Sequence, residues 1–299
     1  MVEAPAYHSP MRGLRLAWIA GIAGIAIAAC GGPSASFNPA TSSSTASPAA
    51  FASEMPPATG TATPAPSTNA LRYVAFGDSW PAGEHCNGCR HFPELWADGL
   101  ETLSGRPVQL TNYTGEREHT PADGKDSTTL LQAVRDDATT RAAIADADVI
   151  LIATGANEYG VADAAIRAGT CGGPDDADCI RALGERWRTN FDAILDEIVA
   201  LRAGQPTVIR LVNGANPFVS YPEMVEGMPE GFATGNGALI VQLLTDAVCD
   251  AAEAHDAVCV DVRPLLNGPS MLEPAQEESP EAIRAVADAL IATGIDELD

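Results

Sequence analysis

From residue 71 onward, short apolar segments alternate with longer segments whose apolar residues recur at helical spacing. The short segments have the length and β-branched composition of buried strands, and the longer ones have the pattern of amphipathic helices. Strands that alternate with helices in this way pair in parallel, with helices packed on both faces of the sheet. The sequence therefore predicts an α/β fold, a three-layer α/β/α sandwich with a five-stranded parallel sheet.

The expected strands cover residues 71–76, 108–112, 149–153, 207–212 and 258–262. The expected helices cover residues 92–103, 127–145, 180–203, 238–254 and 280–292. The third strand is apolar throughout, as a central parallel strand should be. The last helix has a proline in its first turn, where a missing N–H costs nothing. One domain, residues 71–299, accounts for all of these elements.

The first 70 residues differ in composition from the rest of the chain. Arg12 and Arg15 lead into an apolar run that is too short to be a comfortable transmembrane helix, and small residues end this run before Cys30. This pattern resembles a bacterial lipobox. We expect residues 1–30 to be a lipoprotein signal peptide that ends at the lipidated Cys30; an ordinary signal peptide with an incidental cysteine is the alternative.

Residues 31–70 are dominated by Ser, Thr, Ala, Pro and Gly and show no apolar periodicity. Such a segment buries too little apolar surface to fold, so we expect a disordered tether. Together with a lipid on Cys30, it would hold residues 71–299 outside the cytoplasm, anchored to the bacterial cell membrane. Without the lipid, the protein would be secreted.

The formal net charge is -23, and the excess of acid falls on residues 71–299. Such a surface repels nucleic acid and anionic lipid head groups, so we expect no nucleic-acid partner. Strong acidity also keeps a protein soluble, and this is the simpler explanation of the charge. We expect the protein to be a monomer.

Six of the seven cysteines form three pairs of close sequence neighbours, and Cys30 stands apart. In an oxidising compartment these pairs predict three disulfides. The pairs are Cys86–Cys89, Cys171–Cys179 and Cys249–Cys259. The first pair lies between His85 and His91, so a redox pair or a metal site is an alternative there.

Three successive predicted strands are followed by residues suited to acyl transfer. Ser79 follows the first strand, Gly115 the second and Asn157 the third. The carboxyl ends of parallel strands share one edge of the sheet, so these residues should lie together. Ser79 would be the nucleophile, and the Gly115 N–H and the Asn157 side chain would stabilise the oxyanion. Taken singly, each has a structural reading as a helix cap or turn residue.

These residues resemble the conserved blocks of the SGNH (GDSL-type) hydrolases. Gly-Asp-Ser at 77–79 matches the first block, Gly115 the second, and Gly-Ala-Asn-Glu at 155–158 the third, with glutamate in place of the usual aspartate. The resemblance spans residues 71–299. It implies a flavodoxin-like sheet and an esterase or lipase-like activity on a small-molecule, glycan or lipid ester, with no cofactor and no metal.

The fourth block of the family, Asp-x-x-His before the last helix, is missing. Alignment places Pro274 at the aspartate and Glu277 at the histidine, and no histidine follows His255. A serine nucleophile needs a general base, so this departure bears directly on activity.

Several residues could replace the missing histidine. Glu277 could act as the base if burial raises its pKa. His119, or one of His85 and His91, could swing toward Ser79 from a nearby loop. His255 should lie at the amino edge of the sheet, away from the site. The alternative to an active enzyme is a catalytically degenerate surface lipoprotein that binds an acylated or glycan ligand in the same cleft.

Overall fold

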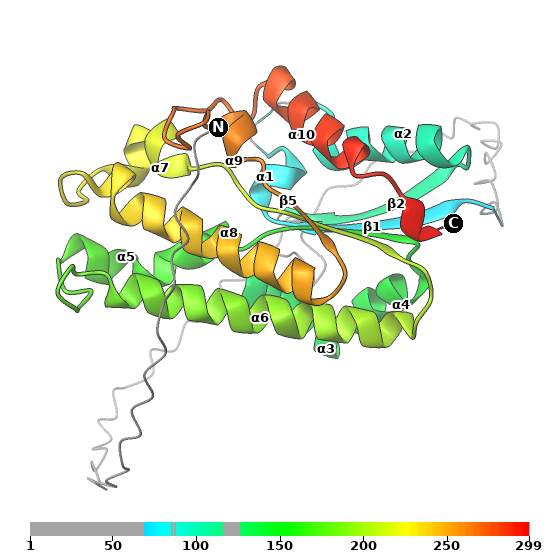
Figure 1. The fold of residues 1–299 in the computed structure, drawn as a ribbon, viewed down its shortest axis with the longest axis horizontal. Coiled ribbons are helices and arrows are strands. Elements are labelled where there is room, and N and C mark those ends of the chain that lie inside the picture. Colours follow the sequence, from blue (N-terminus) through cyan, green and yellow to red (C-terminus); the bar gives the residue numbers. More distant parts are fainter. Residues whose placement is uncertain (1–68, 85, 87, 116–125, 299) are drawn as a thin grey trace, which may run out of the picture. The chain divides into compact units, whose positions relative to one another are not determined.

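Five parallel strands form one sheet in the order β2-β1-β3-β4-β5 (Figure 1). The computed structural model describes residues 69–84, 86, 88–115 and 126–298. The strands are β1 Leu71–Gly77, β2 Val108–Thr114, β3 Val149–Ala153, β4 Val208–Val212 and β5 Val258–Val260. This is the flavodoxin-like order. The predicted α/β fold is thereby confirmed. The predicted signal peptide 1–30 with Cys30, nearly all of the tether, His85 and His119 lie outside the described residues.

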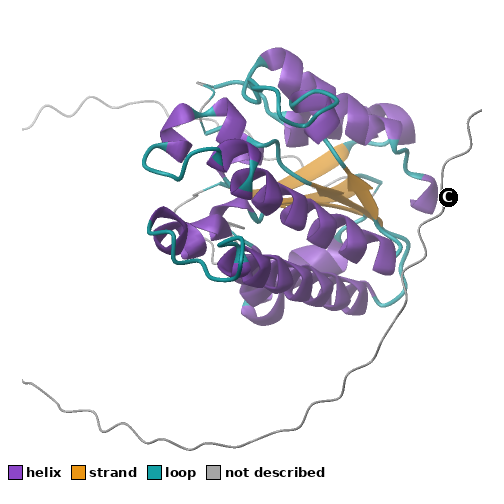
Figure 2. Cartoon of the chain, turned by 60° about the vertical axis from the view of Figure 1, so that its left-hand side comes forward, coloured by secondary structure: helices purple, strands orange, loops and turns teal. Residues whose placement is uncertain are grey.

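Helices cover both faces of the sheet (Figures 1 and 2). One face carries α2 Phe92–Ser104 and α10 Pro280–Ala292, and the other carries α3 Ser127–Asp136, α4 Ala138–Asp146, α6 Asp178–Arg202 and α8 Asn236–Ala254. Along β1, Tyr73 and Ala75 pack into the first layer, and Val74 and Phe76 pack into the second. Burial on both faces explains why β1 is an apolar run rather than an alternating one.

The predicted helix 127–145 is wrong in one respect, because the structure has two helices there. Asp137 separates α3 from α4 in an extended conformation, and its carboxylate accepts hydrogen bonds from the backbone N–H and the hydroxyl of Thr140. A side chain that caps a new helix start competes with continuing the old helix.

Short helices in the connections were not predicted. They are α1 Ser79–Ala82, α5 Gly160–Arg167, α7 Pro217–Ser220 and α9 Arg263–Leu266, together with the 3₁₀ turns η1 Ala156–Tyr159, η2 Pro222–Val225, η3 Phe232–Thr234 and η4 Asp296–Leu298. Most have fewer residues than a periodic pattern needs to be recognised.

The three predicted disulfides are confirmed. Cys86–Cys89 follows α1, Cys171–Cys179 closes a loop before α6, and Cys249–Cys259 joins α8 to β5. The disulfide reading of the first pair therefore prevails over the metal reading, because both thiols are consumed in the bond.

Among the described residues, the helical segment Phe232–Ala254 is long and apolar enough to cross a membrane. Its core, α8, instead packs against α6 and buries Ile240, Leu244, Ala247 and Val248. The apolar character of this segment is explained by its place in the protein core.

Candidate active site at the carboxyl edge of the sheet

Ser79 is the first residue of α1, directly after the end of β1. The carboxylate of Asp78 accepts a hydrogen bond from the backbone N–H of Trp80 at 3.1 Å, so Asp78 and not Ser79 caps this helix. A Cβ at Gly77 would lie 2.3 Å from Cγ of Pro81 and 2.8 Å from the carbonyl oxygen of Ala153. The Gly-Asp-Ser sequence thus allows a close turn that ends with Ser79 at the carboxyl edge of the sheet.

A cavity of about 820 Å³ opens beside Ser79, and we call it the Ser79 cavity. This volume lies within the roughly 300–1,000 Å³ range of small-molecule sites. The polar residues of its lining include Asp78, Ser79, Asn157, Glu277 and Glu278. Its aromatic wall consists of Trp80, Tyr159, Phe218 and Tyr221, and α8 contributes an apolar wall of Ile240, Val241 and Leu244.

The three residues predicted to meet at this edge are not equivalent in the structure. Ser79 and Asn157 both line the Ser79 cavity, and Gly115 does not. The backbone N–H of Gly115 donates to the carbonyl of Gly77 at 3.1 Å and so extends the pairing of β1 with β2. The oxyanion role of Gly115 stays a prediction. It requires that the Gly115 N–H gives up its hydrogen bond to the Gly77 carbonyl and donates to the oxyanion instead.

Gly115 has a second role, which is to let α1 pack closely. Its φ is +79°, and a Cβ there would lie 2.6 Å from Cβ of Ala82 and 2.7 Å from Oε1 of Glu84. Gly105 also has a positive φ, +63°, but a Cβ there meets nothing within 4 Å. Alanine substitutions at these two positions therefore separate two free-energy costs, that of the positive φ and that of crowding at Cβ.

Gly115→Ala should lower the free energy of unfolding by about 2–4 kcal/mol, against about 1–2 kcal/mol for Gly105→Ala. The difference arises because only the first variant pushes α1, which carries Ser79, away from β2. Urea unfolding of both variants measures it. Equal losses for the two variants would contradict the crowding.

Asn157 lies in η1, next to a buried carboxylate. Glu158, the residue that departs from the usual aspartate, accepts hydrogen bonds from the backbone N–H and hydroxyl of Ser127 and from the hydroxyl of Thr128. These bonds fasten the start of α3 to the turn that carries Asn157. The glutamate therefore has a structural role, and Asn157 remains at the surface of the cavity.

The segment between α9 and α10 carries Glu277 to the Ser79 cavity. The backbone N–H of Ala275 donates to the hydroxyl of Ser220 on α7 at 3.0 Å. The hydroxyl of Ser279 caps α10 by accepting from the N–H of Ala282 at 3.2 Å. Contacts on both sides of Glu277 thus hold its backbone in place.

Two carboxyl groups of the cavity have pKa values near neutrality. Burial raises the pKa of Glu277 to about 7; a hydrogen bond from Tyr221 acts in the opposite direction, and the charge of Glu278 raises it again. Burial likewise raises the pKa of Asp78 to about 7, the N–H of Trp80 opposes this, and the charges of Glu277 and Glu84 add to it. A carboxylate with such a pKa is suited to general base catalysis at neutral pH.

These raised pKa values make stability depend on pH. Both groups bind protons more tightly when folded, so their stabilising contribution is present below about pH 4 and lost as pH rises to about 7. Asp78→Asn, which retains an oxygen to cap α1, should raise the free energy of unfolding at pH 8 by on the order of 2 kcal/mol and much less at pH 4. Urea unfolding at the two pH values tests this, and a gain independent of pH would refute the assignment.

None of the described histidines is part of the cavity lining. His91 precedes α2, and its buried ring makes an edge contact with the ring of Trp80. Its Nε2 lies 3.6 Å from Oε2 of Glu278. His255 ends α8, and its ring contacts the carbonyl of Ala251 and the carboxylate of Asp196. Of the candidate bases within the described ranges, Glu277 is therefore the one that lines the cavity.

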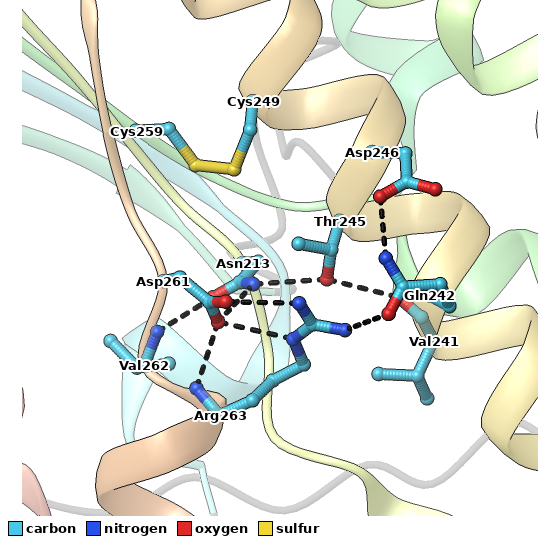
Figure 3. Close-up of polar contacts among 10 residues, drawn as sticks. All are labelled: Asn213, Val241, Gln242, Thr245, Asp246, Cys249, Cys259, Asp261, Val262 and Arg263. Carbon is cyan, nitrogen blue, oxygen red and sulfur yellow. Dashed lines mark hydrogen bonds and ion pairs between the residues drawn. A yellow bond between two sulfur atoms is a disulfide. The ribbon is translucent and has the colours of Figure 1, made fainter. Parts of the chain in front are cut away.

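A polar network that was not predicted from the sequence joins the residues that follow β4 and β5 to each other and to α8 (Figure 3). The Asn213 amide donates to Asp261 at 2.7 Å and to the hydroxyl of Thr245 on α8 at 2.9 Å. Arg263 donates to Asp261 and to Gln242. Burial alone would raise the pKa of Asp261, but the hydrogen bonds from Arg263 and Asn213 lower it. Asp261 is therefore a structural anion, and Thr245 joins this network to the cavity.

No family model and no curated protein matches this sequence. Among solved structures, a lipase from a goat rumen metagenome has a TM-score of 0.57 at 17% identity, over 77% of this chain and 100% of that one. An extracellular lipase from Streptomyces rimosus has a TM-score of 0.48 at 15% identity, over 74% and 100%. An SGNH-hydrolase family esterase has a TM-score of 0.41 at 16% identity, over 76% and 98%.

At such low identity, the likeness to the rumen lipase concerns the fold alone. It agrees with the parallel sheet of order β2-β1-β3-β4-β5 and the helices on both of its faces. The flavodoxin-like sheet was expected from the resemblance of the Gly-Asp-Ser and Gly-Ala-Asn-Glu segments, and the helices on both faces from the alternation of strands and helices. This chain therefore has a three-layer α/β/α fold with a five-stranded parallel sheet, and it shares this fold with the rumen lipase.

Proposed function

We propose that this chain is an extracytoplasmic serine ester hydrolase that transfers an acyl group to water through Ser79. The observation that carries the proposal is that Ser79, Asn157 and Glu277 line the same cavity. They supply a nucleophile, a hydrogen-bond donor for the oxyanion and a base. The lipases and esterases with a similar fold support this class of reaction.

In the proposed reaction, the Glu277 carboxylate takes the proton of the Ser79 hydroxyl while Oγ forms a bond to the ester carbonyl carbon. The negative charge that develops on the carbonyl oxygen is stabilised by the side-chain N–H of Asn157 and the backbone N–H of Ser79. Protonated Glu277 then gives its proton to the leaving alcohol as the ester bond breaks. Glu277 next takes a proton from a water molecule whose oxygen attacks the acyl carbon, and it returns this proton to Oγ of Ser79 as the acyl–serine bond breaks and the acid is released.

Tyr221 supports the base in this scheme. Its hydroxyl forms a hydrogen bond with Glu277, which holds the carboxylate and favours its ionised form. The burial that raises the pKa of Glu277 makes the ionised carboxylate a stronger base than an exposed one. Together these two effects provide a base that works near neutral pH without a histidine.

The proposed location outside the cytoplasm rests on the three disulfides and on the composition of residues 1–70. Disulfides persist in oxidising compartments. A lipid on Cys30 and the tether that follows would anchor the enzyme to the membrane, and a monomer suffices for this arrangement.

A second candidate is a degenerate member that binds an acylated or glycan ligand without turnover. The observation that favours it is the glutamate in place of the family histidine, with no described histidine lining the cavity. Here the same cavity would hold the ligand, and Ser79 would not react.

The pH dependence of hydrolysis tests the proposed function. For the full-length chain acting on p-nitrophenyl butyrate, kcat/KM should rise through about pH 7 and level off above it, because ionised Glu277 is the active form. An initial-rate assay between pH 5 and 9 measures the profile. No enzymatic hydrolysis, or a rate that falls as pH rises through 7, would contradict the proposal.

A further inference from the structure

Every charged residue that lines the Ser79 cavity is acidic. The four are Asp78, Glu223, Glu277 and Glu278, and the lining found among the described residues holds no lysine, arginine or histidine. The formal net charge of the chain has the same sign, at -23. A substrate or product with an anionic group therefore meets repulsion in this cavity, and a cationic one meets attraction.

The basic side chains of His91 and Arg263 are not part of the cavity lining. The ring of His91 lies outside the cavity, 3.6 Å from Oε2 of Glu278, and this buried oxygen accepts no hydrogen bond from the described residues. Arg263, the first residue of α9, donates hydrogen bonds to Asp261 and Gln242 (Figure 3). The charges of Glu277 and Glu84 raise the pKa of Asp78, and the charge of Glu278 raises the pKa of Glu277. A cation inside the cavity would offset this concentration of negative charge.

Aromatic rings provide the other half of a site for an organic cation. Tyr221 forms a hydrogen bond with Glu277, and its pKa is raised first by burial and then by Glu277, with Glu278 and Glu223 adding to the effect. Tyr221 and the three carboxylates that act on it all line the same cavity. An ammonium group against an aromatic face gains about 0.5–2 kcal/mol from the ring alone, and quaternary ammonium ligands are bound by such rings.

The remaining wall of the cavity is of opposite character. Ile240, Val241 and Leu244 of α8 add apolar surface to the lining. A volume of about 820 Å³ accommodates a charged head and an apolar chain together. The cavity therefore offers both carboxylates and apolar surface, as an amphiphilic ester requires.

We propose that the ester hydrolysed at this site carries a quaternary or protonated amine in its alcohol part, bound between the Tyr221 ring and the carboxylates of Glu223 and Glu278, with the acyl part against α8. The inference rests on the proposed function, because it names the substrate class of the same site. The cation would also favour the ionised form of Glu277, so a substrate of this class promotes the protonation state that its own cleavage needs.

A pair of esters that differ in one charge tests the proposal. Butyrylcholine and 3,3-dimethylbutyl butyrate have nearly the same shape, but the first has a quaternary nitrogen where the second has carbon. With the full-length chain at pH 8 and low salt, kcat/KM should be about tenfold or more higher for butyrylcholine. The ratio of the two values should fall as salt is added.

Two variants locate the effect. Glu223→Gln should reduce the ratio at least about threefold, because it removes one carboxylate beside Tyr221. Glu253→Gln makes the same change of charge at an exposed position near the other end of α8, and it should leave the ratio unchanged. Equal kcat/KM values for the two esters, a preference for the neutral ester, or equal effects of the two variants would overturn the proposal.

A binding measurement separates this inference from the proposed function. If neither ester is hydrolysed, the proposed function fails, and calorimetric titration with choline and with 3,3-dimethylbutanol then decides the cation site. Tighter binding of choline that Glu223→Gln weakens supports the site. Equal binding of the two alcohols, or no binding of choline, overturns it.

Discussion

Ser79→Ala should abolish ester hydrolysis by this protein, with kcat/KM falling by about 10⁴-fold or more if hydrolysis proceeds through an acyl-enzyme. The oxyanion donors and the apolar wall remain in this variant, so substrate still binds, but no nucleophile is left to accept the acyl group. An assay on p-nitrophenyl butyrate above pH 7 measures the effect. Its structural basis is the position of Ser79 as the first residue of α1 and as part of the cavity lining.

Ser104→Ala is the matched control for this variant. Ser104 ends α2, and its hydroxyl donates to the carbonyl of Leu100, away from the cavity lining. The control should hydrolyse the ester at the wild-type rate. Equal rates for wild type and Ser79→Ala would show that any hydrolysis proceeds without the serine.

Glu277→Gln should lower kcat/KM by about 10²–10⁴-fold, the usual contribution of a general base. Glutamine keeps the size of the side chain and an oxygen that can accept from Tyr221, but it cannot take a proton. The rise of activity through about pH 7 should disappear in the same variant. Glu281→Gln, an exposed change on the first turn of α10, is the control that should retain both the rate and the pH profile.

Glu277→His distinguishes the active enzyme from the degenerate one. Histidine restores the family residue at the aligned position, so a protein that lacks only its base should gain activity. An active wild type, a loss in Glu277→Gln and no gain in Glu277→His would together support glutamate as the base. An inactive wild type that becomes active in Glu277→His would instead support the binding protein. Equal activity of wild type and Glu277→Gln would contradict the role of Glu277.

The sheet could be predicted from sequence because its strands are continuous apolar runs. Burial of β1 on both faces leaves a pattern that is visible without a structure. The break at Asp137 was missed because the same residue can continue one helix or cap the next, and the choice depends on a hydrogen bond to Thr140. The four-residue helices α1, α7 and α9 are too short to show a period.

Part of the candidate site could also be predicted, because its residues follow these apolar runs. Ser79 and Asn157 follow apolar strands, and parallel strands end at one edge. Asn213 and Asp261 follow strands as well, so the rule that found Ser79 could have found their network too. The engagement of the Gly115 N–H was not visible, because it depends on the register of β1 with β2.

The surroundings of Glu277 could not be read from its neighbours in sequence. Its partner Tyr221 comes from the connection between α7 and η2, and Asp78 comes from the end of β1. Three separate segments thus determine the pKa values of Glu277 and Asp78. Only the fold brings them together, and the raised pKa follows from their shared burial.

Covalent labelling with a neutral alkyl fluorophosphonate tests most directly whether Ser79 is a nucleophile activated by Glu277. Mass spectrometry of the digested full-length chain should find one adduct, on Ser79, in the wild type and none in Ser79→Ala. Labelling of Glu277→Gln at pH 8 should be slower by about 10²-fold or more. No adduct on Ser79 in the wild type, or an equal labelling rate in Glu277→Gln, would contradict the account.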